Sequence, residues 1–233
     1  MASAVKTMGL LGGMSWESTL VYYRAINEIV RESLGGLHSA SLILNSVDFG
    51  PLERLQHADD WAQIARVLAG AAIQLERAGA DFLIICTNTM HRVAPEIQEA
   101  LQIPLLHIAD ATGEVLVEQG IKTVGLLGTA FTMEQPFYRE RLEQHHQLDV
   151  IVPDDRDRAF VHKVIYEELC LGRFRPEARQ EYLRIIDRLA ARGAEAVILG
   201  CTEIGMLVDQ QSTTTRLLDT TAIHARKAVE YAL

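Results

Sequence analysis

The stretch Arg77-Ala-Gly-Ala-Asp-Phe-Leu-Ile-Ile-Cys-Thr-Asn-Thr89 decides the fold, because it returns later in the chain in nearly the same form. The second copy is Ala191-Arg-Gly-Ala-Glu-Ala-Val-Ile-Leu-Gly-Cys-Thr-Glu203. In both copies a helix is expected to end before a glycine, an apolar run of strand length follows, and small polar residues end the run. The chain therefore uses one unit twice: a helix end, a buried strand and a polar loop.

The cysteines of the two copies do not align with each other. With the two glycines aligned, Cys86 pairs with Gly200 and Thr87 pairs with Cys201. If the two halves fold alike, the hydroxyl of Thr87 and the thiol of Cys201 occupy equivalent places, and Cys86 is the last residue of its strand.

Two further pairs of segments repeat. Residues 6–12 match residues 122–128 at six of seven positions, and residues 104–113 resemble residues 216–225. The offsets of the three pairs are 116, 114 and 112 residues, a drift too small for three coincidences, so we infer one duplication. Strands alternate with helices, which predicts an α/β fold: two homologous parallel-sheet halves related by a pseudo-twofold axis.

The duplication divides the chain into an N-terminal α/β half, residues 1–119, and a C-terminal α/β half, residues 120–233. No flexible Pro- or Ser-rich linker separates them. The final helix, expected over residues 221–233, is a candidate to pack back on the first half.

Composition describes a folded chain that avoids nucleic acid and membranes. Of 233 residues 48% are hydrophobic and 23% are charged, which argues against disorder. A net charge of -9 without a basic stripe disfavours nucleic-acid binding. We find no secretory signal, and no apolar run approaches the roughly 20 residues of a membrane helix. Three cysteines without metal-ligand spacing fit a reducing cytoplasm.

Polar loops follow four of the predicted strands, where open parallel sheets bind ligands. The loop of residues 12–15 corresponds by the repeat to residues 128–129 with Thr132. The loop of residues 87–89 corresponds to residues 200–203. Backbone N–H groups at the following helix starts could bind a carboxylate. The arrangement suits a small anion addressed from two sides. Nucleotide binding is disfavoured, because the dinucleotide fingerprint and the P-loop lysine are both missing.

The three cysteines differ in their surroundings. Cys201 lies in a polar loop before an expected helix start, a place where a helix dipole stabilises a thiolate, so we favour a functional role. Cys86 ends an apolar strand and is expected in the core. Cys170 is expected to be structural.

Histidines and charged residues near these loops have open roles. His91 either orients a substrate carboxylate or caps its helix, and His107 and His224 are expected to link the halves through hydrogen bonds. Lys163, and Arg54 with Gln56 in an expected loop after the second strand, become candidates only if the substrate has a second acidic group.

Three motifs carry a resemblance to a known family: residues 10–18 (Leu-Leu-Gly-Gly-Met-Ser-Trp-Glu-Ser), residues 108–111 (Ile-Ala-Asp-Ala) and residues 167–172 (Glu-Glu-Leu-Cys-Leu-Gly). With the two polar loops, they make the whole chain resemble the aspartate/glutamate racemase family, especially its bacterial broad-specificity and L-aspartate/glutamate-specific branch. The resemblance implies a cofactor-independent enzyme, commonly dimeric, whose partner is a small amino-acid substrate. No pyridoxal lysine motif is evident.

In this family two thiols exchange the α-proton from opposite faces, and the resemblance assigns one role to Cys201. The other falls on Thr87, a departure that we associate with the L-specific branch. Other matched positions imply binding roles: Asn88, Thr89, Thr129 and Thr202 at the α-carboxylate and amino group, Met14 and Gln56 at the substrate, and Lys163 at the side-chain carboxylate.

Thr87 makes the expected chemistry asymmetric, because an alcohol stays protonated at ordinary pH whereas a thiol can become a thiolate. We therefore expect Cys201 to remove the α-proton, from the L form by resemblance, and Thr87 to reprotonate the opposite face directly or through water. Two alternatives stay open: an amino-acid binding protein that has lost turnover, and a related cofactor-free decarboxylase or cis-trans isomerase.

Overall fold

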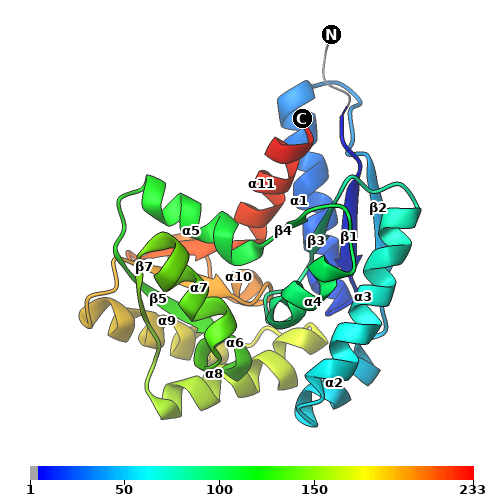
Figure 1. The fold of residues 1–233 in the computed structure, drawn as a ribbon. Helices are drawn as coiled ribbons and strands as arrows, with labels where there is room; N and C mark the ends of the chain where they lie inside the picture. Colours follow the sequence, from blue (N-terminus) through cyan, green and yellow to red (C-terminus); the bar gives the residue numbers. More distant parts are fainter. Residues whose placement is uncertain (1–4) are drawn as a thin grey trace. The chain divides into compact units, whose positions relative to one another are not determined.

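The computed structural model describes residues 5–233 and contains two four-stranded parallel sheets of identical strand order (Figure 1). The first sheet has the order β2-β1-β3-β4 and the second β6-β5-β7-β8. The strands are β1 (Met8–Gly12), β2 (Leu42–Ser46), β3 (Phe82–Ile85), β4 (Leu105–Leu106), β5 (Thr123–Gly128), β6 (Asp149–Ile151), β7 (Ala196–Gly200) and β8 (Arg216–Asp219). The predicted α/β class and the duplication are confirmed.

Helices connect the strands of each sheet. The α-helices are α1 (Trp16–Leu34), α2 (Phe49–His57), α3 (Trp61–Arg77), α4 (Ala94–Glu99), α5 (Ile108–Glu118), α6 (Ala130–Glu134), α7 (Pro136–His146), α8 (Asp155–Glu167), α9 (Pro176–Ala191), α10 (Ile204–Leu207) and α11 (Thr220–Ala232). Short 3₁₀ helices cover Thr89–Val93, Leu169–Leu171 and Gln210–Ser212.

The repeated stretch performs the same structural task in both sheets. The glycine before each strand has φ of 101°, the left-handed region that ends a helix at little cost in glycine. The acidic residue that follows accepts a backbone N–H from the neighbouring strand's start: Asp81 from Thr7 at 2.6 Å, and Glu195 from Thr123 at 2.9 Å. These bonds fix the register of β1 against β3 and of β5 against β7.

The core of the first sheet lies between its strands and the two helices α1 and α11, which run side by side in Figure 1. Inward-facing residues alternate along β1 and β3 as a strand requires. The fully buried set includes Met8, Leu10, Phe82 and Ile84 from the strands, Tyr22 and Ile26 from α1, and Ala225, Ala228 and Val229 from α11.

The chain separates into two compact units, one of residues up to Ile108 with His224–Leu233, and one of Ala109–Ile223. The sequence places the boundary near Gly120 and leaves open that the helix after His107 crosses to the other half. In the structure α5 lies in the second unit, where it packs on α7. Asp110 of α5 accepts two hydrogen bonds from Arg141, at 2.6 and 2.7 Å. A side chain at Gly113 would come within 2.4 Å of the His146 ring.

Several elements differ from their prediction. The expected loop after the second strand is α2, with Asp48 as its N-cap, so Arg54 and Gln56 lie on a helix. The pattern of residues 134–146 predicts one helix, and the structure has α7 there, which begins two residues later because Pro136 starts its first turn. α6 lies where the sequence predicts only a polar loop. The pattern of residues 90–101 also predicts one helix, which the structure divides into the 3₁₀ helix Thr89–Val93 and α4.

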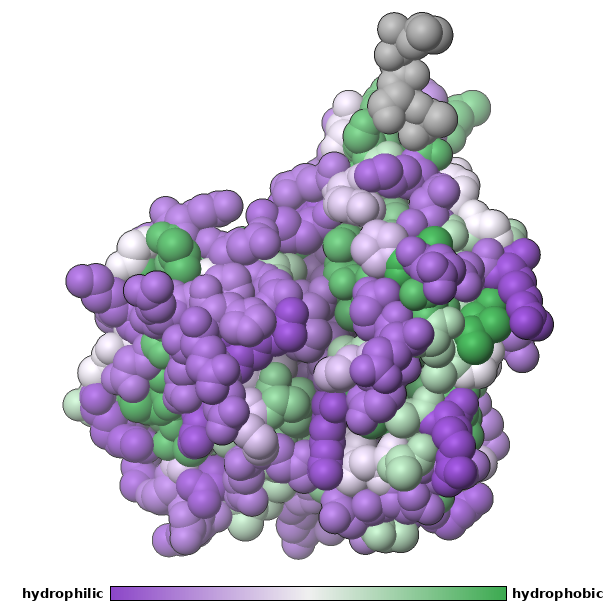
Figure 2. Space-filling model, viewed as in Figure 1, coloured by the Kyte–Doolittle hydropathy of each residue, from purple (hydrophilic) through white to green (hydrophobic). Residues whose placement is uncertain are grey.

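The surface of the described residues is largely polar on the face that is drawn in Figure 2. Apolar residues lie there in small separate groups. Among residues 5–233, no helix has both the length and the apolar character that crossing a bilayer requires.

Candidate active site

The first unit places two of the predicted loops at the carboxyl ends of β1 and β3. Ser15 caps α1, accepting a hydrogen bond from Ser18 N–H, and the Ser18 hydroxyl donates to the carbonyl of Cys86 at 3.1 Å. The N–H of Gly13 donates to the hydroxyl of Thr19 at 2.8 Å. These bonds tie the loop of residues 12–15 to the end of β3.

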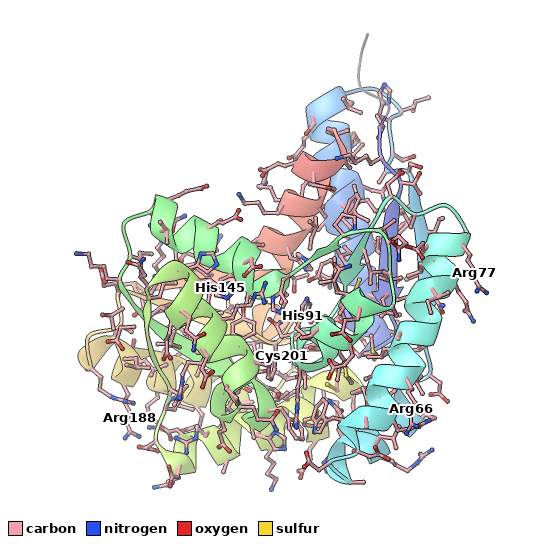
Figure 3. All side chains as sticks on the ribbon, viewed as in Figure 1. Arg66, Arg77, His91, His145, Arg188 and Cys201 are labelled. Carbon is pink, nitrogen blue, oxygen red and sulfur yellow. The ribbon has the colours of Figure 1, made fainter. Side chains whose placement is uncertain are left out.

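Thr87 begins the second loop and is partly exposed. Its N–H donates to the carbonyl of Ile85 at 2.9 Å, and its own carbonyl accepts a hydrogen bond from the ring of His91 at 2.8 Å. His91 is buried (Figure 3) and also accepts the N–H of Ile108 at 3.3 Å. The prediction left open whether His91 binds substrate or supports its helix; both its nitrogens bind backbone.

Other predicted binding residues of the first unit lie near the same strand ends or on α2. Asn88 and Thr89 follow Thr87 directly and are buried. Met14 lies in the loop before α1, and Gln56 is a buried residue of α2. The glutamine, placed by prediction on a loop, is thus held by a regular helix.

Cys86 is a core residue, as predicted. Its side chain is fully buried in the apolar cluster of the first unit. Burial raises the pKa of its thiol far above the ordinary value, because nothing there compensates the lost hydration of a thiolate. Its place in an apolar core therefore disfavours Cys86 as the base of this unit.

In the second unit, the loop after β7 pairs Cys201 with Glu203. The thiol of Cys201, which Figure 3 labels, donates to Glu203 Oε2 at 3.0 Å, and both residues are buried. The thiol of Cys170, which is partly buried, lies 3.9 Å from the other oxygen of the same carboxylate. A thiol and a carboxylate in direct contact form a pair that can exchange one proton.

The electrostatics of Cys201 correct the expectation of a helix-stabilised thiolate. Burial raises the pKa of this thiol well above its usual value, and the nearby charge of Glu203 raises it further. The expected helix start is α10, which has only 4 residues and little dipole to offset burial. The raised pKa favours the protonated thiol, so Cys201 needs a proton acceptor before it can act as a base.

The loop after β5 is occupied by bonds within its own unit. Thr129 caps α6 by accepting the N–H of Thr132 at 3.3 Å, and the N–H of Ala130 donates to His162 Nδ1 at 3.1 Å. Two of the N–H groups that we expected to bind a substrate carboxylate therefore already have protein partners. Thr129 itself is buried, as is Thr202.

Lys163 lies on the outer face of α8, not in a closed pocket. Its side chain is 68% exposed, and its ammonium lies 3.8 Å from Glu167 one turn on. The charge of Lys163 nevertheless contributes to the lowered pKa of the buried Glu168, whose main partner is Arg175.

Sequence reasoning missed two residues of these loops. Glu203 stands in the quoted stretch, two positions after Cys201, and an acidic residue that close to a thiol was the available signal. His162 lies 32 residues from the loop that it supports, and no local pattern connects the two. Among the described residues, no group of three or more His, Cys, Asp or Glu side chains is arranged to hold a metal ion.

The two loops that end β3 and β7 place a hydroxyl and a thiol at equivalent points of duplicated α/β units, an arrangement typical of two-base isomerases. Residues 11–228 match the family described as Asp/Glu/Hydantoin racemase, and the chain belongs to this family.

Relatives of known sequence and structure agree. A solved structure described as a putative Asp/Glu racemase, from Yersinia pestis, is 54% identical with a TM-score of 0.91, covering 97% of this chain and 99% of that one. An aspartate racemase homologue from Pyrococcus horikoshii OT3 is 36% identical with a TM-score of 0.84, at the same coverage.

The chain is also 25% identical to the broad specificity amino-acid racemase RacX of Bacillus subtilis (strain 168), covering 95% of this chain and 96% of RacX. The predictions of the family, of its α/β fold and of the enzyme class, an amino-acid racemase, are confirmed.

Proposed function

We propose that the protein is a cofactor-independent racemase that interconverts the L and D forms of aspartate or glutamate. The names of its relatives support an acidic amino acid for two of them and a broader range for RacX. Cys201 and Thr87 serve opposite faces of the α-carbon in this proposal.

The observation that carries the proposal is the hydrogen bond from the Cys201 thiol to the buried Glu203 carboxylate. Because the pKa of the thiol is raised, the proton must leave before Cys201 can attack an α-proton. Glu203 lies in position to receive it. The S–H bond breaks, an O–H bond forms on Glu203, and the thiolate then removes the α-proton of the substrate.

Thr87 returns a proton to the opposite face. An alcohol donates poorly unless the carbanion is strongly basic, and it is a worse base than a thiol. A water reprotonates the Thr87 alkoxide, and the hydroxide that this leaves takes the proton from Glu203, so that the thiol, the hydroxyl and the carboxylate are all restored. The two directions therefore differ: removal of a proton by Thr87 is the harder step, so turnover of the D form is slower than turnover of the L form.

Binding residues complete the proposal. Asn88, Thr89, Thr129 and Thr202 hold the α-carboxylate and the amino group. The side-chain carboxylate goes to Lys163, an exposed cation whose ammonium lies 3.8 Å from Glu167. Gln56 and Met14 contact the rest of the substrate.

Solvent deuterium exchange at the α-carbon tests the proposal. The protein is incubated in D₂O with L- and D-aspartate, L- and D-glutamate and several neutral amino acids, and both deuterium content and enantiomer ratio are followed. We expect exchange with inversion, faster from the L forms. Binding without exchange would indicate an amino-acid binding protein, and neither binding nor exchange would indicate another acid as substrate.

A matched pair of cysteine variants tests the assignment of the base. Cys201→Ala should lose at least about 10²-fold in exchange of the L form, a typical general-base contribution. Cys86→Ala, which removes a buried thiol of the core, should retain it. The reverse result, or full activity in Cys201→Ser, would remove Cys201 from the mechanism.

The setting of the enzyme is part of the proposal. Three free cysteines, Cys86, Cys170 and Cys201, favour the cytoplasm, where thiols stay reduced. We further propose a homodimer without nucleic-acid or membrane partners; sedimentation of the purified protein distinguishes a dimer from a monomer.

A further inference from the structure

A buried histidine connects Thr87 to the end of β4. His91 is only 1% exposed, and each ring nitrogen meets one backbone group. Nδ1 lies 2.8 Å from the carbonyl oxygen of Thr87, and Nε2 lies 3.3 Å from the N–H of Ile108. The ring thus bridges the catalytic loop to a segment 17 residues further along the chain.

These two partners leave the ring one protonation state. A carbonyl oxygen only accepts and a backbone N–H only donates, so Nδ1 must carry hydrogen and Nε2 must not. A charged ring would place two N–H groups against each other at Ile108. Burial lowers the pKa of His91 well below its usual value, and the nearby rings of His107 and His224, at 4.5 and 5.9 Å, lower it further.

The segment that anchors His91 is itself fixed. On the other side of His107, the carbonyl of Leu106 accepts a hydrogen bond from His224 Nε2 at 2.9 Å. The second nitrogen of His224 accepts the Tyr22 hydroxyl at 2.8 Å, and both side chains are fully buried. The segment of residues 106–108 is therefore held by His224 at Leu106 and by His91 at Ile108. Because His91 also binds the carbonyl of Thr87, it connects Thr87 to this fixed segment.

We propose that His91 is a positioning residue for proton delivery by Thr87. By holding the Thr87 carbonyl, the ring fixes the backbone from which the hydroxyl projects. A misplacement of about 1 Å in a reacting group can cost about 10²-fold in rate, and a weak donor such as an alcohol depends on orientation more than a thiolate does. This role rests on the proposed function, because it assumes that Thr87 delivers a proton.

Two substitutions separate the two hydrogen bonds of the ring. In His91→Asn, the side-chain amide N–H can replace Nδ1 and donate to Thr87. In His91→Gln, the longer side chain can place its amide oxygen near Nε2 and accept from Ile108, but it cannot donate to Thr87 as well. His91→Asn therefore keeps the hydrogen bond to Thr87 and His91→Gln keeps the one to Ile108, with the same amide group in both variants.

The measured quantity is the ratio of racemisation to α-deuterium exchange with the L substrate. Exchange on the L face needs only Cys201, whereas inversion also needs Thr87. We expect His91→Gln to lower the ratio by about tenfold or more, and His91→Asn to stay close to wild type. Equal losses of exchange and inversion in both variants, or an unchanged ratio in His91→Gln, would overturn the positioning role.

The ¹⁵N NMR shifts of the His91 ring in the wild-type protein give a measurement that needs no substrate. It remains informative even if both His91 variants fail to fold. We expect the neutral ring with hydrogen on Nδ1. A ring protonated on Nε2 at neutral pH would overturn the proposal. A wild-type protein that exchanges no α-proton would count against the proposed function, whereas a working wild type with an unchanged ratio would count against His91 alone.

Discussion

At the scale of single residues, the structure changes how Cys201 works. The sequence pointed to a loop thiol activated by a helix start, but α10 is too short and burial raises the pKa of the thiol. Activation falls instead to Glu203, whose carboxylate lies 3.0 Å from the sulfur. Glu203 has two opposite effects on Cys201. Its negative charge disfavours the thiolate, but once the carboxylate has accepted the thiol proton that charge is gone.

Glu203→Gln tests this dual role through pH. Without the carboxylate, exchange of the L substrate at pH 7 should fall by about 10²-fold. Because the Glu203 charge contributes to the raised pKa of Cys201, the variant thiol should ionise at lower pH than the wild-type thiol does when Glu203 is charged. The residual activity should therefore rise steeply with pH as solvent base replaces Glu203.

Glu203→Asp is the control, because it keeps the carboxylate on a shorter arm. Its pH profile should keep the wild-type shape at a reduced rate. A Glu203→Gln profile parallel to that of the wild type would show that the carboxylate takes no part in proton transfer. Initial rates of deuterium uptake across the pH range provide the measurement.

At the scale of elements, the sequence predicted the strands of both sheets because apolar runs bounded by glycine have few alternatives. It missed α2 because Gly50 and Pro51 look like a loop, although proline is well suited to a first turn. It missed α6 because Thr129 and Thr132 were assigned to a polar loop, and it started the following helix at Glu134 instead of Pro136. The sequence predicted the polar loops but not the hydrogen bonds that hold them. His91 binds Ile108, 17 residues away, and His162 binds Ala130, 32 residues away, and no local pattern shows either contact.

The mismatch between Cys86 and Gly200 has an explanation at this scale. A side chain at Gly200 would lie 2.8 Å from the carbonyl oxygen of Leu127 and 3.0 Å from the side chain of Leu126. The second sheet therefore closes too tightly at that point for any side chain, whereas the first sheet accommodates a thiol within its core. Duplicated strands diverged in how closely the neighbouring strand approaches.

Gly200→Ala tests the tight approach. Because the nearest atom is backbone, the strands must separate, and we expect a loss of about 1–3 kcal/mol in the free energy of unfolding. The control is Gly70→Ala in the exposed middle of α3, where a side chain meets nothing within 4 Å. That variant should be more stable by about 0.5–1 kcal/mol. Urea unfolding of both variants decides, and equal effects of the same sign would contradict the packing argument.

At the scale of the whole molecule, the chain leaves its first unit after Ile108 and returns at His224. The sequence named the final helix, α11, as a candidate to pack back on the first half, and residues 224–233 belong to that unit. The alanines of α11 pack in the core of the first sheet, and Lys6 donates to the carbonyl of Ala232 through its backbone N–H at 3.0 Å. The homologous halves were predictable from the repeated segments. The position of the last helix depends on contacts between residues more than two hundred positions apart, which repetition does not show.

The position of His224 in this junction makes acid stability a test of the architecture. Burial lowers the pKa of His224 from 6.5 to about 4. Between these values the unfolded chain binds a proton that the folded protein does not, so stability falls as pH falls. One such group costs about 1.4 kcal/mol per pH unit, on the order of 2 kcal/mol between pH 6.5 and 5. His91, with a lowered pKa, acts in the same direction.

Urea unfolding at several pH values measures this slope. Asp219, whose pKa burial raises, gains stability on acidification and partly offsets the histidines, so the comparison of variants is more informative than the wild-type slope. Between pH 6.5 and 5, the free energy of unfolding of His224→Gln should depend on pH less steeply than that of the wild type, by about 1.4 kcal/mol per pH unit. This expectation concerns the slope and does not depend on the absolute stability of the variant. A wild-type slope retained in His224→Gln would mean that burial does not favour the neutral state of His224 in the folded protein.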